Sequence, residues 1–238
     1  MVVSHSHADH AGGQAALMAG LPGARLVLTS ASRQFLAKPD TAKRFAQEDA
    51  HTSGEVARRD GLAPAFPPCL SLLPEPLEEV PPGHVLDLDG LLARLVEAPG
   101  HAPGGLICLV PEEGVALAAD SAGFCTRGGP GFPLYFVSYR QYQASLEAIA
   151  ASQPAALGLG HQDSFAGPAA THYLVATRAH LEREHQAILA GLAAGRDPDD
   201  LAQAIFDRYY QDELSVYPAG SILNCCRLLV RRSGEAAA

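Results

Sequence analysis

Four metal-ligand side chains lie within one short segment near the start of this 238-residue chain. Residues 4–13 read SHSHADHAGG, an H-x-H-x-D-H pattern followed by two glycines. In an extended segment, His5 and His7 project to the same side and can share one ion. Asp9 and His10 follow on a tighter turn and can face a second ion, and the glycines let a helix begin close beside the site. The spacing therefore predicts a two-metal centre.

The donor types indicate which metals such a centre would hold. Imidazole and carboxylate ligands without thiolates suit zinc, iron or manganese, whereas structural zinc sites more often use pairs of cysteines. Two ions need further donors, and three downstream residues have a suitable context. His101 follows the apolar run 91–96, Asp120 follows the run 115–119, and His161 ends the run 155–160. Each is a ligand type at the end of a predicted buried strand.

The composition narrows the class of protein. With 47% hydrophobic residues, the chain can bury an ample core. A net charge of −9 with only 17 Lys and Arg argues against nucleic acid as a partner, because basic side chains make phosphate contacts. No apolar run reaches the length of a membrane span, and no signal peptide opens the sequence. Five cysteines without a C-x-x-C pair fit a reducing compartment, so we expect a cytoplasmic protein.

Local patterns predict the elements around the candidate ligands. Asp89-Gly90 reads as a hairpin turn, and the apolar runs 106–110 and 115–119 predict a second hairpin. A polar pattern predicts a helical stretch from Ser32 to about Arg59, followed by a proline-rich link over residues 64–82. Ser138 is placed to cap a helix over residues 139–151.

The order of these motifs resembles the metallo-β-lactamase superfamily, in which H-x-H-x-D-H precedes a PGH-like turn, an aspartate after a strand and a GH-like turn. The resemblance covers residues 1 to about 165. It implies the αββα sandwich of that family, an α/β fold, and two zinc ions per chain, with iron or manganese as alternatives. It further implies that His5, His7 and His101 bind one ion, that Asp9, His10 and His161 bind the other, and that Asp120 bridges both.

The sequence departs from the family pattern in two ways. Asp120 lies in Ala-Ala-Asp-Ser, where Thr-Gly-Asp is commoner. Family members usually carry several strands before the first histidine motif, and only residues 1–3 precede Ser4 here. We therefore expect an N-terminally truncated fold that exposes a sheet edge and an apolar face, which favours association into a homodimer.

We divide the chain into a metallo-β-lactamase-like catalytic domain, residues 1–165, and a helical C-terminal extension, residues 166–238. In the extension, apolar positions recur at helical intervals up to Gly195, and Asp197 followed by Pro198 begins another helix. The extension weakly resembles the helical, sometimes winged-helix-like, extension of one hydrolase branch of the fold. We expect it to pack or to mediate dimerisation.

The predicted metal centre indicates a hydrolytic mechanism. Two divalent ions that share a water lower its pKa toward neutrality, and the resulting metal-bound hydroxide can attack a carbonyl or phosphoryl centre. Asp9 is the candidate catalytic residue, because it can orient the hydroxide and pass a proton to the leaving group. We expect hydrolysis of an ester, thioester, lactone or amide bond of a small molecule, as in the hydroxyacylglutathione hydrolase and lactonase-like branches that the chain resembles.

Three alternatives stay open from the sequence. They are a nuclease of the same fold, an iron-dependent dioxygenase with a mononuclear site, and an inactive truncated form. Flavodiiron reductases fit less well, because their first motif resembles H-x-E-x-D-H and this chain has His7 at the second position. Substrate identity is not fixed by these motifs, since one fold serves many chemistries.

Overall fold

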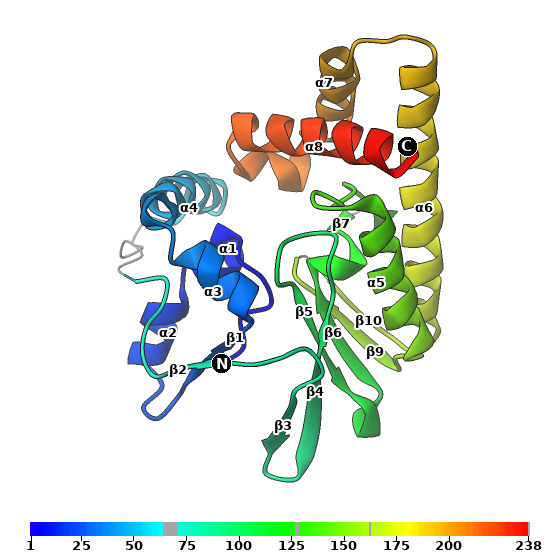
Figure 1. Ribbon diagram of the computed structural model, residues 1–238. Helices are drawn as coiled ribbons and strands as arrows, with labels where there is room; N and C mark the ends of the chain where they lie inside the picture. The colour runs from blue at the N-terminus through cyan, green and yellow to red at the C-terminus, as the bar shows by residue number, and fades with distance from the viewer. Residues whose placement is uncertain (64–70, 127–128, 162, 238) are drawn as a thin grey trace.

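A six-stranded mixed sheet lies at the centre of the computed structural model, which describes residues 1–63, 71–126, 129–161 and 163–237 (Figure 1). Its strand order is β10-β9-β6-β5-β4-β3, and within it only β6 and β9 pair in parallel. These strands are β3 (Val85–Leu88), β4 (Leu91–Glu97), β5 (Leu106–Val110), β6 (Val115–Ala119), β9 (Ala156–Leu159) and β10 (Ser164–Ala166).

Two further pairs of short strands complete the described β structure. One pair, β7 (Cys125–Thr126) and β8 (Gly129–Pro130), is antiparallel. In the other, β1 (Leu26–Leu28) lies parallel to β2 (Leu77–Glu79). Strand β2 falls within the proline-rich link that we expected over residues 64–82, of which 64–70 lie outside the described residues. The link is therefore partly a strand, which pairing with a distant segment stabilises.

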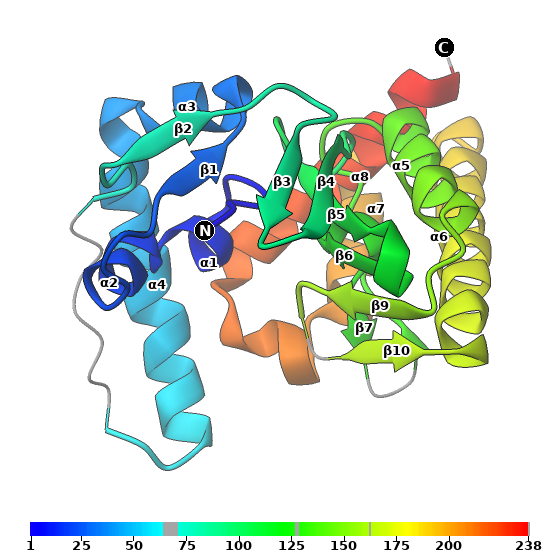
Figure 2. The same ribbon diagram turned by 90° about the horizontal axis from the view of Figure 1, so that it is seen from below.

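Helices cover both outer sides of this β structure. In Figure 2, α2, α3 and α4 flank the β1–β2 pair, whereas α5 and α6 cover the far side of the central sheet. This layering confirms the predicted α/β class, and the predicted helical C-terminal region is present. The helices are α1 (Ala8–Ala11), α2 (Gln14–Ala19), α3 (Ser30–Leu36), α4 (Pro39–Arg59), α5 (Tyr139–Ala151), α6 (Pro168–Ala193), α7 (Pro198–Tyr209) and α8 (Ala219–Ala237), with 3₁₀ turns η1 (Pro111–Glu113), η2 (Asp120–Ala122) and η3 (Asp212–Val216).

The helical stretch expected from Ser32 to about Arg59 forms two helices, α3 and α4, with a break at residues 37–38. Pro39 is the first residue of α4, where its missing N–H costs no hydrogen bond. Proline also disfavours helical backbone at the residue before it, and Lys38 is extended, with φ of −64° and ψ of 134°. The break lets the chain turn, so that α4 lies beside the metal-ligand segment described below.

Several local predictions are confirmed. Asp89 and Gly90 join β3 to β4 with φ of 57° and 96°, as the tight hairpin turn requires. The Ser138 side chain caps α5 by accepting a hydrogen bond from the Gln141 N–H at 3.3 Å. Asp197 caps α7 through the Asp199 N–H at 2.7 Å. Such turns and caps can be predicted from sequence because a few neighbouring residues determine each of them.

The main hydrophobic core runs from the central sheet into the C-terminal helices. It joins buried side chains of the sheet and α5, such as Ile107 and Ile149, to Leu181 of α6 and Leu229 of α8. A second cluster around Leu28 and Phe45 supports the N-terminal helices. Packing is therefore continuous across residue 165, and our division into two domains at that point remains a prediction.

Some apolar side chains of the sheet face solvent. Leu88, Leu92 and Leu117 are 54%, 42% and 51% exposed.

Within the described parts of the chain, no helix combines the length and the apolar character needed to cross a membrane.

Candidate metal centre

The H-x-H-x-D-H segment begins beside β1 and ends in a one-turn helix. The Val3 N–H donates to a carbonyl of β1 at 2.9 Å, which holds the chain extended before the motif. His7 is the last extended residue and precedes α1, with φ of −94° and ψ of 160°. Asp9 and His10 lie within α1. The change from extended to helical backbone turns the first histidines and the Asp9-His10 pair toward different parts of one centre.

The downstream candidates come from three strands that run in the same direction. Strand β4 is antiparallel to β5, which is antiparallel to β6, and β6 is parallel to β9. The carboxyl ends of β4, β6 and β9 therefore meet at one edge of the sheet. His101, Asp120 and His161 follow these three ends. The topology thus explains why residues far apart in sequence converge.

The structure brings all seven candidate ligands together in two groups. In the first group, His7 Nδ1 lies 3.1 Å from His5 Nε2 and 3.0 Å from His101 Nε2. In the second group, His161 Nε2 lies 3.0 Å from His10 Nε2 and 3.4 Å from Asp9 Oδ2. Each group offers ligand atoms close enough to share one ion, and the first group includes Asp120.

Asp120 lies between the two groups. Its Oδ2 is 3.3 Å from His101 Nε2, and its Oδ1 is 3.4 Å from His10 Nε2 and 3.5 Å from His161 Nε2. The side chain is 7% exposed. Gly160 permits this arrangement, because a Cβ atom at residue 160 would collide with Asp120 Oδ1. One carboxylate thus faces both groups, as a bridging ligand would.

The hydrogen-bonding pattern fits metal ions. His101 Nδ1 donates to the Leu134 carbonyl at 2.8 Å, so its Nε2 presents a lone pair toward Asp120 Oδ2. Asp120 Oδ1 is buried and has no hydrogen-bond partner among the described residues. Lone pairs that face one another in a buried site repel unless a cation lies between them. The donor set and this orphaned oxygen therefore suit two divalent ions, which we assign to these seven residues as a proposal.

The protonation states of His5, His7 and Asp120 also suit metal binding, whereas the Asp120 carboxylate outweighs burial and raises the pKa of His10. Burial, followed by the charge of His101, holds the pKa of His5 well below its ordinary value. The same causes lower the pKa of His7 to about 3. Burial alone would raise the pKa of Asp120, but the surrounding histidines, His10 first, outweigh it and hold that pKa well below its usual range. Neutral imidazoles and an ionised carboxylate are the forms that bind divalent metals.

The backbone is strained at the residue before the bridging carboxylate. Ala119 has φ of 44° and ψ of −132°, a region that residues other than glycine rarely adopt. The pairing of β6 with β9 also shifts register there. In the family that the sequence resembles, Thr-Gly-Asp is commoner at this position. The alanine therefore carries strain on the order of 1–3 kcal/mol.

We expect Ala119→Gly to raise the free energy of unfolding by about 1 kcal/mol, because relief of strain exceeds the entropy that glycine adds to the unfolded chain. Denaturant unfolding of the metal-free protein measures this change. Ala118→Gly is the matched control, since Ala118 is fully buried in β6 without a positive φ and should lose stability. Equal losses in both variants would contradict the assignment of strain to Ala119.

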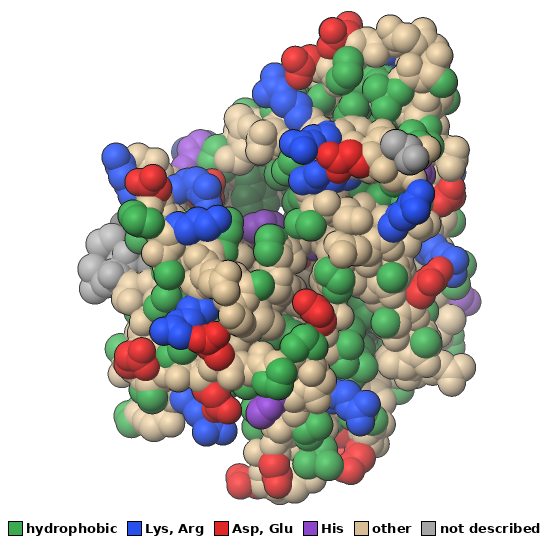
Figure 3. Space-filling model, in the orientation of Figure 1, with side chains coloured by type: hydrophobic (Ala, Val, Ile, Leu, Met, Phe, Trp, Pro, Cys, Tyr) green, Lys and Arg blue, Asp and Glu red, His purple; other side chains and the backbone are tan. Residues whose placement is uncertain are grey.

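A cavity of about 400 Å³ opens above the candidate ligands. Figure 3 shows this hollow between the N-terminal helices and α8, with histidine side chains at its floor. Helix α4 forms one wall, and η3 and α8 form the roof. The C-terminal helices therefore do more than the packing that we expected of them, because they help to form the cavity over the candidate metal centre.

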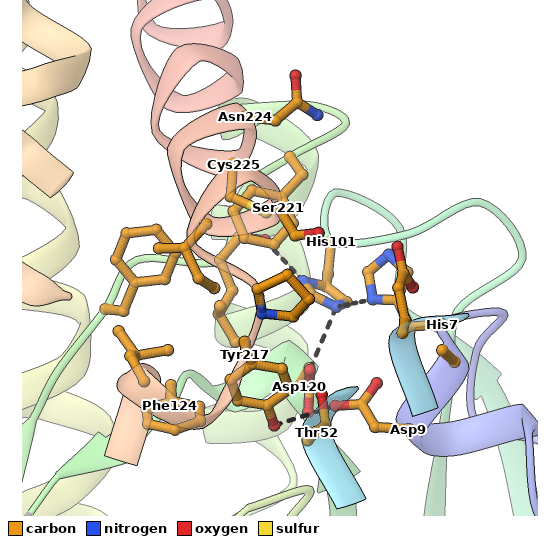
Figure 4. A pocket seen from close by; sticks show the side chains of 18 of the residues that line it. His7, Asp9, Thr52, His101, Asp120, Phe124, Tyr217, Ser221, Asn224 and Cys225 are labelled. Carbon is orange, nitrogen blue, oxygen red and sulfur yellow. Dashed lines mark hydrogen bonds and ion pairs between the residues drawn. The ribbon is translucent and has the colours of Figure 1, made fainter. Parts of the chain in front are cut away.

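Tyr217, between η3 and α8, reaches directly into the centre. Its hydroxyl donates to Asp9 Oδ2 at 3.1 Å (Figure 4). Burial, together with the nearby charge of Asp9, raises the pKa of the Tyr217 phenol, so it remains a donor. No sequence motif singles out Tyr217. It is far from Asp9 along the chain and belongs to no local motif, so only the tertiary fold reveals the contact.

Five other histidines lie outside the two groups. Of these, His185 is buried, stacks on Tyr139 with ring centroids 3.6 Å apart, and bonds to Ser233 Oγ at 3.0 Å. His180 Nε2 lies 3.1 Å from the Tyr209 hydroxyl. These two histidines join elements of the core. The complete set is His51, His84, His172, His180 and His185.

The sequence also matches a protein-family model. The matched model is described as the metallo-beta-lactamase superfamily and covers residues 1–161. The chain belongs to the metallo-β-lactamase superfamily. Proteins of this superfamily are generally metal-dependent hydrolases. No curated protein matches the chain.

Solved structures of metallo-β-lactamase proteins share this fold. A family protein of Thermus thermophilus has a TM-score of 0.63 and 21% identity, over 99% of this chain and 74% of that one. An archaeal superfamily protein of Sulfolobus tokodaii has a TM-score of 0.58 and 20% identity, over 98% and 79%. A β-lactamase domain protein of Burkholderia ambifaria has a TM-score of 0.61 and 18% identity, over 97% and 66%. The shared fold thus includes the helices after residue 165.

Proposed function

We propose that this chain is a binuclear metal-dependent hydrolase that cleaves an ester, thioester, lactone or amide bond of a small molecule. The observation that carries this proposal is the pair of facing donor groups, joined by Asp120, at the floor of a 400 Å³ cavity. We propose zinc as the metal, with iron or manganese as alternatives, since His and Asp ligands accept all three. When bound, the ions would acidify a water molecule and polarise the scissile carbonyl.

The chain's own residues supply the proton transfers and the enclosure. Asp9 lines the cavity, and its carboxylate can accept a proton from the attacking water and deliver it to the leaving group. The Tyr217 hydroxyl holds this carboxylate in place by donating to Oδ2. Asp120, held between the two donor groups, fixes their spacing. The roof formed by η3 and α8 limits access of bulk water.

The cavity favours a small molecule over a polynucleotide. Its volume lies in the range of sites that bind ligands of drug size. Glu48 and Asp49 of α4 line it, and these carboxylates would repel a phosphodiester chain. The nuclease alternative is therefore less well supported. We further propose a cytoplasmic location, supported by free thiols at Cys108, Cys125 and the Cys225-Cys226 pair.

The test begins with elemental analysis of the purified chain after washing with a mild chelator. We expect about two metal ions per chain, hydrolysis of at least one member of a panel of esters, thioesters and lactones, loss of that activity on strong chelation, and recovery when zinc is restored. Activity that survives complete removal of metal would contradict the proposal. Oxygen uptake by an iron-loaded chain that cleaves no member of the panel would favour the dioxygenase alternative.

A further inference from the structure

The cavity above the candidate metal centre has two unlike walls. One, which we call the apolar wall, consists of Phe124, Phe132, Leu134, Phe136, Leu214 and Leu228. The other, which we call the polar wall, carries Arg44, Glu48, Asp49 and Thr52 of α4, with Asp9 beside them, and Phe35 and Phe45 also line this side. In Figure 4, Phe124 lies on one side of Asp120, and His7 and Asp9 lie on the other. A ligand that spans the centre would therefore meet apolar surface at one end and charged side chains at the other.

The apolar wall begins at the metal-ligand histidines. The Phe136 ring lies 5.2 Å from the His101 ring, and the Phe124 ring lies 5.3 Å from the His161 ring, between centroids. From Phe136 the apolar surface continues to Phe132, 6.1 Å away between ring centroids. An acyl carbon at the centre can thus extend its chain along the wall.

The positions of the apolar side chains make them a binding surface for a flexible chain. Phe132, Leu134 and Leu214 are 2%, 5% and 4% exposed, yet each contributes to the lining of the cavity. Removing a methylene group from water into such surroundings is favourable. If about half of the cavity holds the chain and a methylene fills roughly the 30 Å³ of a water molecule, about seven methylenes fit.

The polar wall suits the other part of the substrate. Glu48 is half-buried, and burial raises the pKa of its carboxyl, although the charge of Arg44 opposes this. These groups retain some solvent contact and can hydrogen-bond to a polar leaving group. An apolar leaving group would strip water from them without compensation. The two walls therefore give the substrate a direction, with its acyl chain under η3 and α8 and its leaving group along α4.

We propose that the substrates are esters or thioesters of straight-chain carboxylic acids of about six to ten carbons, joined to a polar leaving group. This inference rests on the proposed hydrolase function and specifies its substrate class. It assigns the C-terminal helices a direct part in specificity, because Leu214 and Leu228 belong to the segment after residue 165.

The first experiment compares p-nitrophenyl acetate, butyrate, hexanoate, octanoate and decanoate on the zinc-loaded full chain. All five share one leaving group, so only the acyl chain varies. We expect kcat/KM to rise by up to about fourfold per methylene and to level off once the cavity is filled. A flat or falling series, with the acetate ester still cleaved in a chelator-sensitive manner, would overturn the inference while leaving the proposed hydrolase function intact.

Two leucines of α8 provide a matched pair of variants. Leu228 and Leu223 are both partly buried, but only Leu228 lines the cavity among the described residues. We expect Leu228→Gln to lower the ratio of kcat/KM for the octanoate ester to that for the acetate ester about tenfold, since a polar amide replaces apolar surface. Leu223→Gln should leave this ratio unchanged. Equal ratios in both variants and the unmodified chain would contradict the assignment of Leu228 to the apolar wall.

A binding measurement separates this inference from hydrolysis itself. Titration calorimetry with the zinc-loaded chain should show octanoate binding at least tenfold more tightly than acetate, with most of the difference lost in Leu228→Gln. If no ester is cleaved, the proposed hydrolase function fails, but preferential binding of octanoate would still support the apolar acyl site. Equal affinity for octanoate and acetate would overturn it.

Discussion

Replacing Asp120 with alanine should deprive the chain of both metal ions and abolish its hydrolase activity. The Asp120 carboxylate faces both donor groups, with Oδ2 toward His101 and Oδ1 toward His10 and His161. Without it, histidines would have to hold two divalent charges with little carboxylate compensation. Loss of a group that only orients a metal ligand costs about 10–100-fold in affinity or activity, so loss of the bridging ligand should cost at least about a hundredfold.

Elemental analysis and ester hydrolysis measure the two effects on the same preparations. Asp120→Asn tests whether charge or shape matters. The amide keeps the side-chain volume but presents an NH₂ group to one donor group, so we expect it to fail as a bridge as well. Asp207→Ala is the control for loss of a carboxylate, because Asp207 is exposed on α7 and bonds only to Gln203 in the described structure. An Asp120→Ala chain that retains two ions would refute the bridging assignment.

The candidate ligands could be predicted from the sequence because their signals are local. Four of them occupy one six-residue motif, and the other three follow apolar runs that end at glycine or at a short turn. The strands β5 and β6 were predicted at the bounds that the structure gives, since each is a short apolar run between turn residues. The parallel direction of β4, β6 and β9, which brings His101, Asp120 and His161 together, depends on sheet pairing that no local pattern specifies.

The rest of the site depends on long-range packing and could not be predicted. Helix α4 forms a cavity wall only because the break at Pro39 turns it toward α1, and the polar pattern of residues 32–59 does not show the direction of that turn. Strand β2 was hidden in a proline-rich stretch, because its pairing partner β1 lies far away along the chain. Tyr217 contacts Asp9 although the two residues lie far apart in the sequence. Apolar residues of α8 look the same in sequence whether they line a cavity or fill a core.

Replacing Asp9 with alanine should lower kcat/KM by about 10²–10⁴-fold, the contribution typical of a general acid–base group. Asp9 differs from Asp120 in its surroundings. Its side chain is 32% exposed, it belongs to the second donor group alone, and its Oδ2 accepts the Tyr217 hydroxyl. The first donor group, with His5, His7 and His101, does not include it. We therefore expect the variant to keep about one ion per chain while losing most of its activity.

Steady-state kinetics on a cleaved ester, with metal content measured in parallel, distinguishes this outcome from that of Asp120→Ala. Asp49→Ala is the matched control, because Asp49 is a second carboxylate that lines the cavity but lies outside both donor groups. It should change kcat/KM by less than about tenfold, since it takes part in no proton transfer. If Asp9→Ala retained full activity with one ion bound, neither proton transfer by Asp9 nor a need for the second ion could be upheld. The reaction would then depend on the first donor group alone.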